Sequence, residues 1–573
     1  MRARTGWLAV VLMLFAASVG AQRRFALTVD NIMSGPGLVG YEPSSPRWSG
    51  DSSRVYFEWK QPSDPVLSPM DTYVVARDGS APRKLSEEES KLAPPVTGDR
   101  SEDKSKTVFV RDGDVFVYDH ASDKARRLTK TADVESGAQF TRDGERVWFT
   151  RSSNLYAMSL KDGVLEQLTD IRPAGAAGSS GAQAAGARAA TGSVAATRSG
   201  GEEQKGTDSQ EALKKEERDL LDIVKQRAAR REEEEARKKR ENPRKPLTLQ
   251  ARQSVTNLSL SPDGKTAIVS IAEPGQGAKT TIVPNFVTET GYTEDIPART
   301  KVGDVEGRVR VALISVADGS VKYVDHGQRI GRSQQRTEGT EAEKAAEAKT
   351  SAAGIGTAPA RTENTEARGS AKSEAVESQD RAVDLLRPEW SNDGTKAVML
   401  ARSADNKDRW VLALDPATGK TRVLASVHDE SWVGGPGALT LGWLKGDRAV
   451  YFQSERDGYS HLYTVPFDGG EPKQLTSGKW EVLGVRLSED KSRFYLTTNE
   501  GDPAQVHLYS MAAEGGPRTK ITAMPGSHRG VFSPDEKWIA DVYSFSNKPP
   551  ELHVMENRPG AQELKLTNSP TED

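Results

Sequence analysis

The stretch WLKGDRAVYFQSERDGYSHLYTVPFDGGEPKQLT at residues 443–476 contains both patterns that decide the fold. Its first part is a polar turn followed by alternating apolar residues, which predicts two β-strands joined by a tight turn. Its second part is a strand, a polar Asp-Gly-Gly turn and a short strand that ends at Leu475-Thr476. Together the two parts predict about four short strands in one unit.

The first pattern occurs eight times along the chain, and an Asp-Gly or Asp-Lys pair often supplies its turn. The eight copies are WSGDSSRVYF (48–57), RSEDKSKTVFV (100–110), FTRDGERVWF (140–149), LSPDGKTAIVS (260–270), WSNDGTKAVML (390–400), WLKGDRAVYF (443–452), LSEDKSRFYL (487–496) and FSPDEKWIADV (532–542). A copy of the second pattern follows each of them. Eight units of four short strands predict an all-β, eight-bladed β-propeller of four-stranded blades.

The spacing of the units supports this prediction. Asp490 and Asp535 lie 45 residues apart, which is typical of a propeller blade. The fourth unit is longer even when a low-complexity insert is removed, so we expect it to hold an extra loop. The alternatives are a β-solenoid, which would need shorter and more uniform repeats, and a pair of β-sandwiches. Because a single blade cannot bury both faces, we expect large residues such as Trp48 and Trp443 to pack between blades.

Two low-complexity or helical insertions interrupt the repeats, at residues 171–246 and 327–383. Residues 171–210 and the second insert contain few large apolar side chains, and we expect both to be mostly disordered. Residues 211–241 are rich in Glu, Lys and Arg at spacings of three or four, which predicts an exposed helix ending before Pro243. This helix is interpreted as a solvated insertion, with a partner-binding helix as the alternative.

The amino terminus has the features of an export signal. Arg2 and Arg4 precede an apolar run at 7–19, which is too short to span a bilayer as a helix, and small residues follow up to Ala21. We expect residues 1–21 to be a signal peptide, residues 22–573 to form the propeller, and the protein to be periplasmic or secreted, without a membrane span after cleavage. An uncleaved anchor is the alternative.

Composition excludes several classes of site. The chain of 573 residues has no Cys, which excludes disulfides, thiolate metal sites and a Cys nucleophile. The formal net charge of −3 argues against a nucleic-acid partner. The seven His residues are scattered without a metal-binding spacing, so neither a metal nor a cofactor is predicted. Residues 35–40 match Gly-x-Gly-x-x-Gly, but Pro43 and Pro46 follow, and we expect no helix to begin there.

The repeats resemble a known family. SERDGYSHLY (454–463), with the turn at 468–470 and Leu475-Thr476, looks like a propeller blade of the prolyl oligopeptidase family of serine peptidases, in its dipeptidyl peptidase IV branch. TKVGDVEGRVRVALISVADG (300–319) and SNKPPELHVMENRPGAQELKLTNS (546–569) are similar to further parts of that propeller. The resemblance covers roughly residues 25–170, 247–326 and 384–573.

The resemblance implies an eight-bladed propeller that works with an α/β-hydrolase domain and cleaves short peptides, often beside proline. The family's Ser nucleophile stands in a Gly-x-Ser-x-Gly elbow, which no part of this sequence contains. No catalytic residue is therefore predicted. We expect a substrate-gating propeller, truncated before its catalytic domain and inactive alone, with peptides or a hydrolase domain as partners. The alternative is a non-enzymatic periplasmic propeller that binds protein partners, similar to those of the Tol system.

The peptidase branch also uses a Glu pair in the propeller to hold the free amine of its substrate, because carboxylates bind a protonated amine strongly. Its Tyr-Glu-Glu-type motif is absent here. The local candidates are Glu289, Tyr292 and Glu294, in the extra loop of the fourth unit. A plain exposed loop is the alternative interpretation.

Expression of the full chain in a host with an export pathway tests the signal peptide. We expect the mature chain to begin at Gln22, and an Ala21→Arg variant to remain uncleaved because the peptidase requires a small residue there. Intact-mass measurement of the exported protein checks this. Recovery of the full-length chain in the membrane fraction would support the uncleaved anchor instead.

Overall fold

The computed structural model describes residues 28, 29, 33, 35–174, 207–241, 243–301, 303–305, 307–329 and 380–570. Its strands form eight four-stranded antiparallel sheets, each built from consecutive strands of the chain, with one interruption in the fourth. The predicted fold class, an eight-bladed β-propeller, is confirmed. The predicted signal peptide at 1–21 and most of the two low-complexity inserts lie outside the described residues.

By contacts, the chain divides into two compact units. Unit 1 contains residues 1–96 and 521–573, and holds the first and the last blade. Blade 1 consists of β1 (Ser44–Trp48), β2 (Arg54–Trp59), β3 (Asp71–Ala76) and β4 (Arg83–Lys84). Blade 8 consists of β33 (Ser527–Phe532), β34 (Trp538–Phe545), β35 (Lys548–Glu556) and β36 (Leu564–Lys565).

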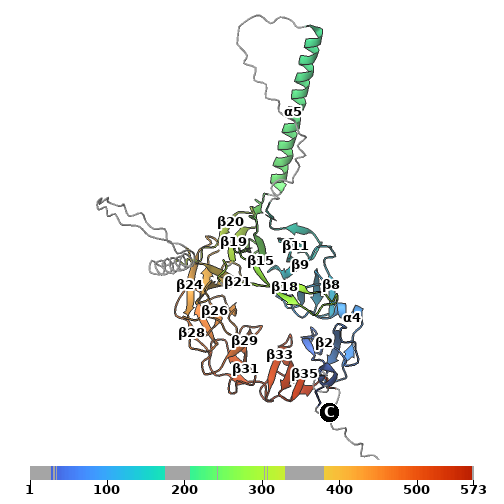
Figure 1. Ribbon diagram of the computed structural model, residues 1–573, viewed down its shortest axis with the longest axis vertical. Coiled ribbons are helices and arrows are strands. Elements are labelled where there is room, and N and C mark those ends of the chain that lie inside the picture. The colour runs from blue at the N-terminus through green and yellow to red at the C-terminus, as the bar shows by residue number, and fades with distance from the viewer. Residues whose placement is uncertain are drawn as a thin grey trace, which may run out of the picture. The chain divides into compact units, whose positions relative to one another are not determined.

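Unit 2, residues 97–520, holds the six remaining blades, whose strands lie side by side in Figure 1. Blade 2 consists of β5 (Asp99–Arg100), β6 (Lys106–Arg111), β7 (Asp114–Asp119) and β8 (Lys124–Arg127). Blade 3 consists of β9 (Glu135–Phe140), β10 (Arg146–Arg151), β11 (Asn154–Ser159) and β12 (Leu165–Gln167). Blade 4 consists of β15 (Ser254–Leu260), β16 (Thr266–Glu273), β19 (Arg308–Ser315) and β20 (Val321–Tyr323).

The last three blades of unit 2 are uninterrupted. Blade 5 consists of β21 (Val383–Trp390), β22 (Ala397–Ser403), β23 (Asp408–Leu414) and β24 (Thr421–His428). Blade 6 consists of β25 (Leu441–Trp443), β26 (Ala449–Ser454), β27 (His461–Pro466) and β28 (Lys473–Gln474). Blade 7 consists of β29 (Val482–Leu487), β30 (Arg493–Thr498), β31 (His507–Ala512) and β32 (Thr519–Lys520).

The extra loop predicted in the fourth unit is present. Between β16 and β19 the chain forms a separate antiparallel ribbon of β17 (Thr280–Asn285) and β18 (Glu294–Thr300). We name residues 280–300 the arm of blade 4. Its separation from the blade sheet explains why this unit is longer than the others.

Both inserts are closed at their base by backbone pairing. β13 (Ile171–Arg172) pairs in parallel with β14 (Leu247–Thr248), so the first insert begins later than the predicted residue 171. Ile171 is buried because it packs in the core between blades 3 and 4, which fixes it to the propeller. At the second insert, Arg329 pairs with Asp380 through a β-bridge and an ion pair of 3.0 Å.

The described helices are few. α5 (Asp208–Glu241) occupies the segment where a charged helix was predicted, and its described side chains are nearly all exposed. α4 (Glu87–Leu92) follows blade 1 and begins with a capping box formed by Ser86 and Glu89. α3 (Pro36–Val39) is a single turn within the Gly-x-Gly-x-x-Gly match, and where Pro43 and Pro46 follow the chain forms strand β1 and not a helix. Among the described residues, no helix combines the length and apolar character that crossing a membrane requires.

Seven of the eight hairpins between the first and second strand of a blade share one partly buried hydrogen-bond arrangement. In blade 5, the hydroxyl of Ser391 donates to Asp393 at 2.6 Å and accepts from the backbone N–H of Lys396 at 3.0 Å. The same pairing joins Ser49–Asp51, Ser101–Asp103, Thr141–Asp143, Ser261–Asp263, Ser488–Asp490 and Ser533–Asp535. This hydrogen bond lowers the pKa of Asp393 to about 2. The repeated Asp in the sequence therefore marks a hydroxyl-stabilised turn.

The residue after this Asp adopts a positive φ. Gly394 has φ 72°, whereas Lys491 occupies the equivalent position of blade 7 with φ 57°. Glycine is favoured in this left-handed conformation because it has no Cβ. This requirement explains the Asp-Gly pairs of the repeat.

The repeated Leu-Thr after the fourth strand also has a structural role. In blade 3, the Thr169 hydroxyl accepts from the backbone N–H of Leu155 at 2.9 Å and donates to Asn154 at 3.0 Å. Thr129, Thr476 and Thr567 accept in the same way in blades 2, 6 and 8. Each Thr therefore holds its blade's outer segment against the third strand.

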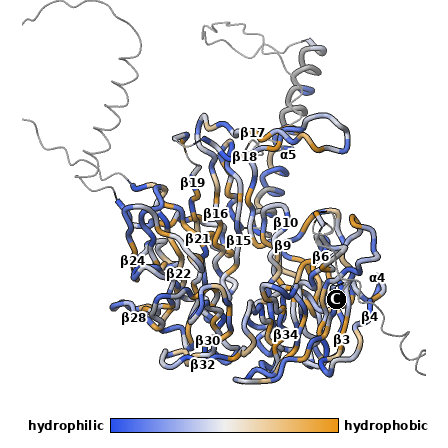
Figure 2. Tube along the Cα trace, turned by 60° about the horizontal axis from the view of Figure 1, so that its bottom comes forward, coloured by the Kyte–Doolittle hydropathy of each residue, from blue (hydrophilic) through white to orange (hydrophobic). Residues whose placement is uncertain are grey.

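Apolar side chains form a core cluster between each pair of neighbouring blades within a unit. Separate clusters join blades 2 and 3, 3 and 4, 4 and 5, 5 and 6, and 6 and 7. In unit 1, a further cluster packs Phe57 and Val75 of blade 1 against Val542 and Leu552 of blade 8. Figure 2 shows the alternation of apolar strand segments and polar turns that this packing requires.

The large residues predicted to pack between blades do so. Trp48 lies in the core between blades 1 and 8, and its Nε1 donates to the carbonyl of Val531 at 2.9 Å. Trp443 lies between blades 5 and 6, and its Nε1 donates to the carbonyl of Glu389 at 3.2 Å. In both cases a Trp at the end of a first strand is tied to the first strand of the neighbouring blade.

A Ser391→Ala substitution tests the hydroxyl-stabilised turn. We expect a loss of about 1–2 kcal/mol in unfolding free energy, because the backbone N–H of Lys396 and the Asp393 carboxylate lose their hydrogen bonds to the buried hydroxyl, and a decrease in Tm of about 1–2 °C. The difference in unfolding free energy between wild type and variant should decrease as the pH falls from 3.8 to about 2. The ionised Asp393 carboxylate, whose pKa the hydrogen bond lowers, stabilises the fold above this range and no longer does so below it.

Thermal unfolding of wild type and variant across this pH range is the measurement. Thr395→Ala is the matched control, since the exposed Thr395 hydroxyl donates to the same Asp393 carboxylate at 2.8 Å. Equal losses from Ser391→Ala and Thr395→Ala would show that the buried hydroxyl has no special role.

Candidate functional site

The predicted substrate-binding residues lie together on the arm of blade 4. Glu289 and Tyr292 belong to the loop that joins β17 and β18, and Glu294 is the first residue of β18. A hydrogen bond of 2.7 Å from the Thr288 hydroxyl to the carbonyl of Tyr292 holds this loop closed. The three candidates therefore lie within one short, ordered hairpin end.

The end of the arm is exposed and carries both apolar and acidic side chains. Tyr292 is 80% exposed, Phe286 is 76% exposed and Val287 is 90% exposed. Within the described residues, neither Glu289 nor Glu294 has a hydrogen bond or ion pair to its carboxylate. Carboxylates suit a protonated amine by charge, and the exposed ring of Tyr292 belongs to the same hairpin end. Their role in substrate binding stays a prediction.

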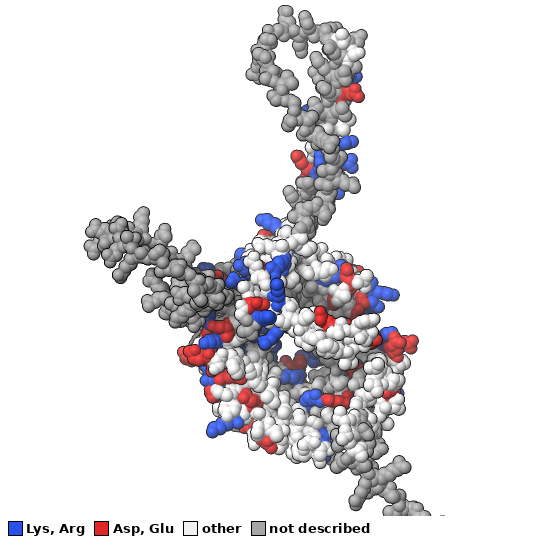
Figure 3. All heavy atoms as spheres, viewed as in Figure 1, with Lys and Arg blue, Asp and Glu red and all other residues white. Residues whose placement is uncertain are grey.

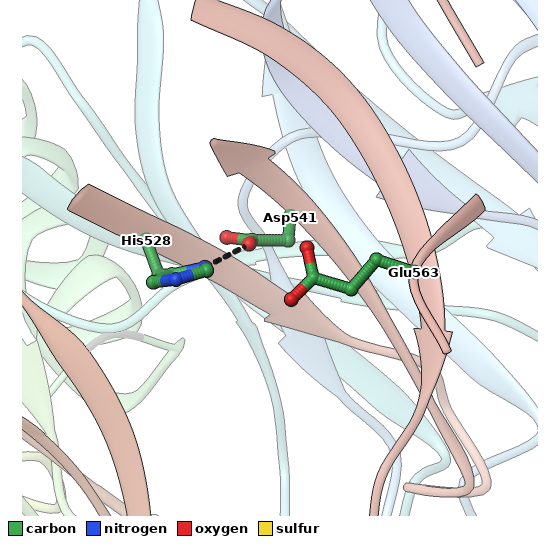
Figure 4. A group of neighbouring side chains, drawn as sticks. All are labelled: His528, Asp541 and Glu563. Atoms are coloured by element: carbon green, nitrogen blue, oxygen red, sulfur yellow. Dashed lines mark hydrogen bonds and ion pairs between the residues drawn. The ribbon is translucent and has the colours of Figure 1, made fainter. Parts of the chain in front are cut away.

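A second polar group lies inside blade 8 (Figure 4). His528 projects from β33, Asp541 from β34 and Glu563 from the residue before β36. His528 and Asp541 are fully buried, and one potential ligand atom from each of the three side chains lies within 4.8 Å of the others. In the pairing of β33 with β34, His528 is opposite Tyr543 and Asp541 is opposite Gly530, so the first two side chains are diagonal neighbours.

The hydrogen bonds of this group are incomplete. His528 Nδ1 lies 2.6 Å from Asp541 Oδ2, and His528 Nε2 lies 2.8 Å from the carbonyl oxygen of Met524. Asp541 Oδ1 and both carboxylate oxygens of Glu563 are buried without a hydrogen-bond partner. Unpartnered buried carboxylate oxygens are costly, so each requires a physical explanation.

Burial and charge act in opposite directions on these groups. Burial alone would lower the pKa of His528, but the hydrogen bond and negative charge of Asp541 outweigh it and raise that pKa. Burial raises the pKa of Glu563, although the His528 charge opposes this. Burial also lowers the pKa of the nearby His553. The group therefore concentrates perturbed side chains in one blade.

The spacing of His residues did not indicate this group, and no metal site was predicted. The three residues come from separate segments, and only the sheet brings them together. One local signal existed: Asp541 interrupts the apolar run Trp538-Ile539-Ala540-Asp541-Val542-Tyr543 of a predicted strand. An acidic residue at an inward strand position is unusual unless it has a partner.

The surface of unit 2 offers a further pocket, of about 500 Å³, beside blades 4 and 5. Its lining includes Arg244, Lys265 and Lys322, which would suit an anion. However, Arg244 pairs with Glu166 and Lys265 with Asp263, so much of this charge is already compensated. Figure 3 likewise shows basic and acidic side chains interspersed over the visible face.

Comparison with known proteins supports the resemblance drawn from the blade motifs. Residues 362–550 match the family model described as the dipeptidyl peptidase IV (DPP IV) N-terminal region. A protein named "Probable dipeptidyl peptidase 4" from Aspergillus flavus is 34% identical over 153 residues, which cover 25% of this chain and 19% of the relative. One named "Probable dipeptidyl-aminopeptidase B" from Emericella nidulans is 29% identical over 126 residues, covering 19% and 14% of the two chains.

Solved structures share the fold over a longer range. The crystal structure of Porphyromonas gingivalis dipeptidyl peptidase 4 aligns with 95% of this chain and 62% of its own, with a TM-score of 0.53 and 14% identity. A putative dipeptidyl aminopeptidase IV from Bacteroides ovatus aligns with 92% of this chain and 61% of its own, with a TM-score of 0.50 and 12% identity. The chain thus spans less than two thirds of these proteins, and the matched segments less than a fifth of the curated relatives. The resemblance to the propeller of the dipeptidyl peptidase IV branch is confirmed.

Amine recognition by the arm can be tested with a dipeptide that carries a free amino terminus. If Glu289 and Glu294 hold the amine, Glu294→Gln should weaken binding at least about tenfold, in line with the roughly 1.5–3 kcal/mol of a hydrogen bond to a charged group. Isothermal titration of the purified chain gives the dissociation constants. An N-acetylated dipeptide should bind wild type as weakly as the variant.

Glu273→Gln is the matched control, because Glu273 ends β16 at the start of the insertion but lies outside the hairpin end. Equal binding of free and acetylated peptides by wild type would contradict the predicted role of the arm.

Proposed function

We propose that this protein, whose residues 362–550 match the model of the dipeptidyl peptidase IV N-terminal region, is the substrate-gating propeller of an exported serine peptidase of that type. The observation that carries the proposal is the family match over residues 362–550. Peptidase relatives that match parts of the chain at 29–34% identity support it. Bond cleavage would be carried out by an α/β-hydrolase domain that works with the propeller.

The division of labour follows from the chemistry of acyl transfer. Cleavage requires a nucleophile, a base and oxyanion donors in one site. The 573 residues contain no Gly-x-Ser-x-Gly elbow, so the nucleophile must come from outside them. The propeller contributes access and orientation, with the carboxylates of the arm as the proposed contact to the peptide amine.

Activity measurements on the purified mature chain test this proposal. We expect the chain alone to bind short peptides with a free amino terminus but to leave a chromogenic Xaa-Pro substrate uncleaved. Fusion of a hydrolase domain from a dipeptidyl peptidase IV-like enzyme after residue 573 should restore cleavage. Cleavage by the chain alone that a serine-directed inhibitor abolishes would refute its inactivity.

Export and localisation in the periplasm or outside the cell are part of the same proposal. They rest on the basic, apolar and small-residue regions of residues 1–21. The intact mass of the exported protein, which shows whether the chain is cleaved after Ala21, tests both.

A non-enzymatic propeller that binds a protein partner is the second candidate function. The exposed apolar side chains of the arm favour it, since exposed apolar patches commonly contact proteins. The DNA after codon 573 discriminates between the two. A region encoding Gly-x-Ser-x-Gly there supports the peptidase, whereas a terminator followed by an unrelated gene supports the binding protein.

A further inference from the structure

We propose that His528, Asp541 and Glu563 of blade 8 form a binding site for one divalent transition-metal cation, with Zn²⁺ as the best match. The site lies within unit 1 and does not depend on the proposed peptidase function. One imidazole nitrogen and two carboxylates are a ligand set that Zn²⁺ accepts, with a fourth position left for water.

Geometry is the first argument. The three side chains come from β33, β34 and the residue before β36, and a ligand atom of each lies within 4.8 Å of the others. Ligands bound to Zn²⁺ at ~2.0–2.2 Å lie roughly 3–3.5 Å apart in a tetrahedron. His528 Nδ1 and Asp541 Oδ2 are 2.6 Å apart, so cation binding requires these two atoms to separate slightly and the half-buried Glu563 to move inward.

The unpartnered oxygens are the second argument. Asp541 is fully buried, yet its Oδ1 has no hydrogen-bond partner, and neither carboxylate oxygen of Glu563 has one. In Figure 4 the two carboxylates and the imidazole converge on one another. A single cation would satisfy oxygen atoms from both carboxylates and would offset their charge.

The environment of His528 is the third argument. Its Nε2 faces the carbonyl oxygen of Met524, which can only accept a hydrogen bond, so Nε2 carries a proton. Its Nδ1 faces a carboxylate oxygen at 2.6 Å, so a proton lies between these two atoms, and a cation that binds here must displace that proton to solvent. A backbone carbonyl that fixes the outer nitrogen is the usual support of a metal-binding histidine.

A second trio of the same residue types shows why convergence matters. On the surface of blade 5, His428 Nδ1 pairs with Asp408 at 2.8 Å and its Nε2 with Glu430 at 3.4 Å. Because the two carboxylates contact opposite nitrogens of the ring, they do not converge on one point. This trio provides a matched control, and Glu430 is almost fully exposed.

Metal binding by the full-length, untagged chain tests the proposal. After treatment with a chelator and its removal, Zn²⁺ should bind at one equivalent, as measured by elemental analysis and competition with a chromophoric chelator. Saturating Zn²⁺ should raise Tm by a few degrees, because a cation that binds only the folded state stabilises it. Co²⁺ in the same site should show the visible absorption of a four-coordinate ion.

Glu563→Gln should weaken Zn²⁺ binding by at least about tenfold, the loss usual even for an outer partner of a metal ligand, and should remove the rise in Tm. Glu430→Gln should leave both unchanged. Wild type that binds no Zn²⁺, or that binds it as tightly as Glu563→Gln does, would overturn the proposal and would leave shared protons as the link between these side chains. If Glu563→Gln fails to fold, stoichiometry and the Co²⁺ spectrum of wild type decide alone.

Discussion

Face-to-face packing of apolar side chains between neighbouring blades is the interaction on which the rest of this structure depends. Each blade is a thin sheet with two faces, and neither face can be buried within the blade itself. The clusters between successive blades of unit 2, and the cluster between blades 1 and 8 of unit 1, solve this problem with Val, Leu, Phe and Trp. Removal of each such side chain from water contributes roughly 1.5–3 kcal/mol to the free energy of unfolding. The packed blades in turn hold the turns and the arm of blade 4.

The repeating part of the fold could be predicted because its signals are local. The Asp of the turn and the Leu-Thr after the fourth strand both serve hydrogen bonds within one blade, so they recur in the sequence at fixed positions. The excess length of the fourth unit also predicted an extra element, which is the ribbon of β17 and β18. Contacts between distant segments left no such mark: the bond from Trp48 to Val531 joins residues 483 positions apart.

The two candidate sites differ in the same way, because one is local in sequence and the other is assembled from distant segments. Glu289, Tyr292 and Glu294 could be named because they are close in sequence, and the structure places them on one hairpin end. The group of His528, Asp541 and Glu563 could not, because strand pairing assembles it from three segments. Ile171 is a further example. Its position at the start of a low-complexity segment placed it in the predicted insert, but its side chain packs in the core.

The paired bases of the two inserts have a consequence for how this protein could change over time. Because β13 pairs with β14, and Arg329 with Asp380, the two ends of each insert are held together at the propeller independently of the sequence between them. The entropy of closing a loop grows only with the logarithm of its length, so doubling an insert costs about 0.6 kcal/mol. These segments can therefore be lengthened, shortened or replaced, in evolution or by design, while the adjoining blades keep their geometry.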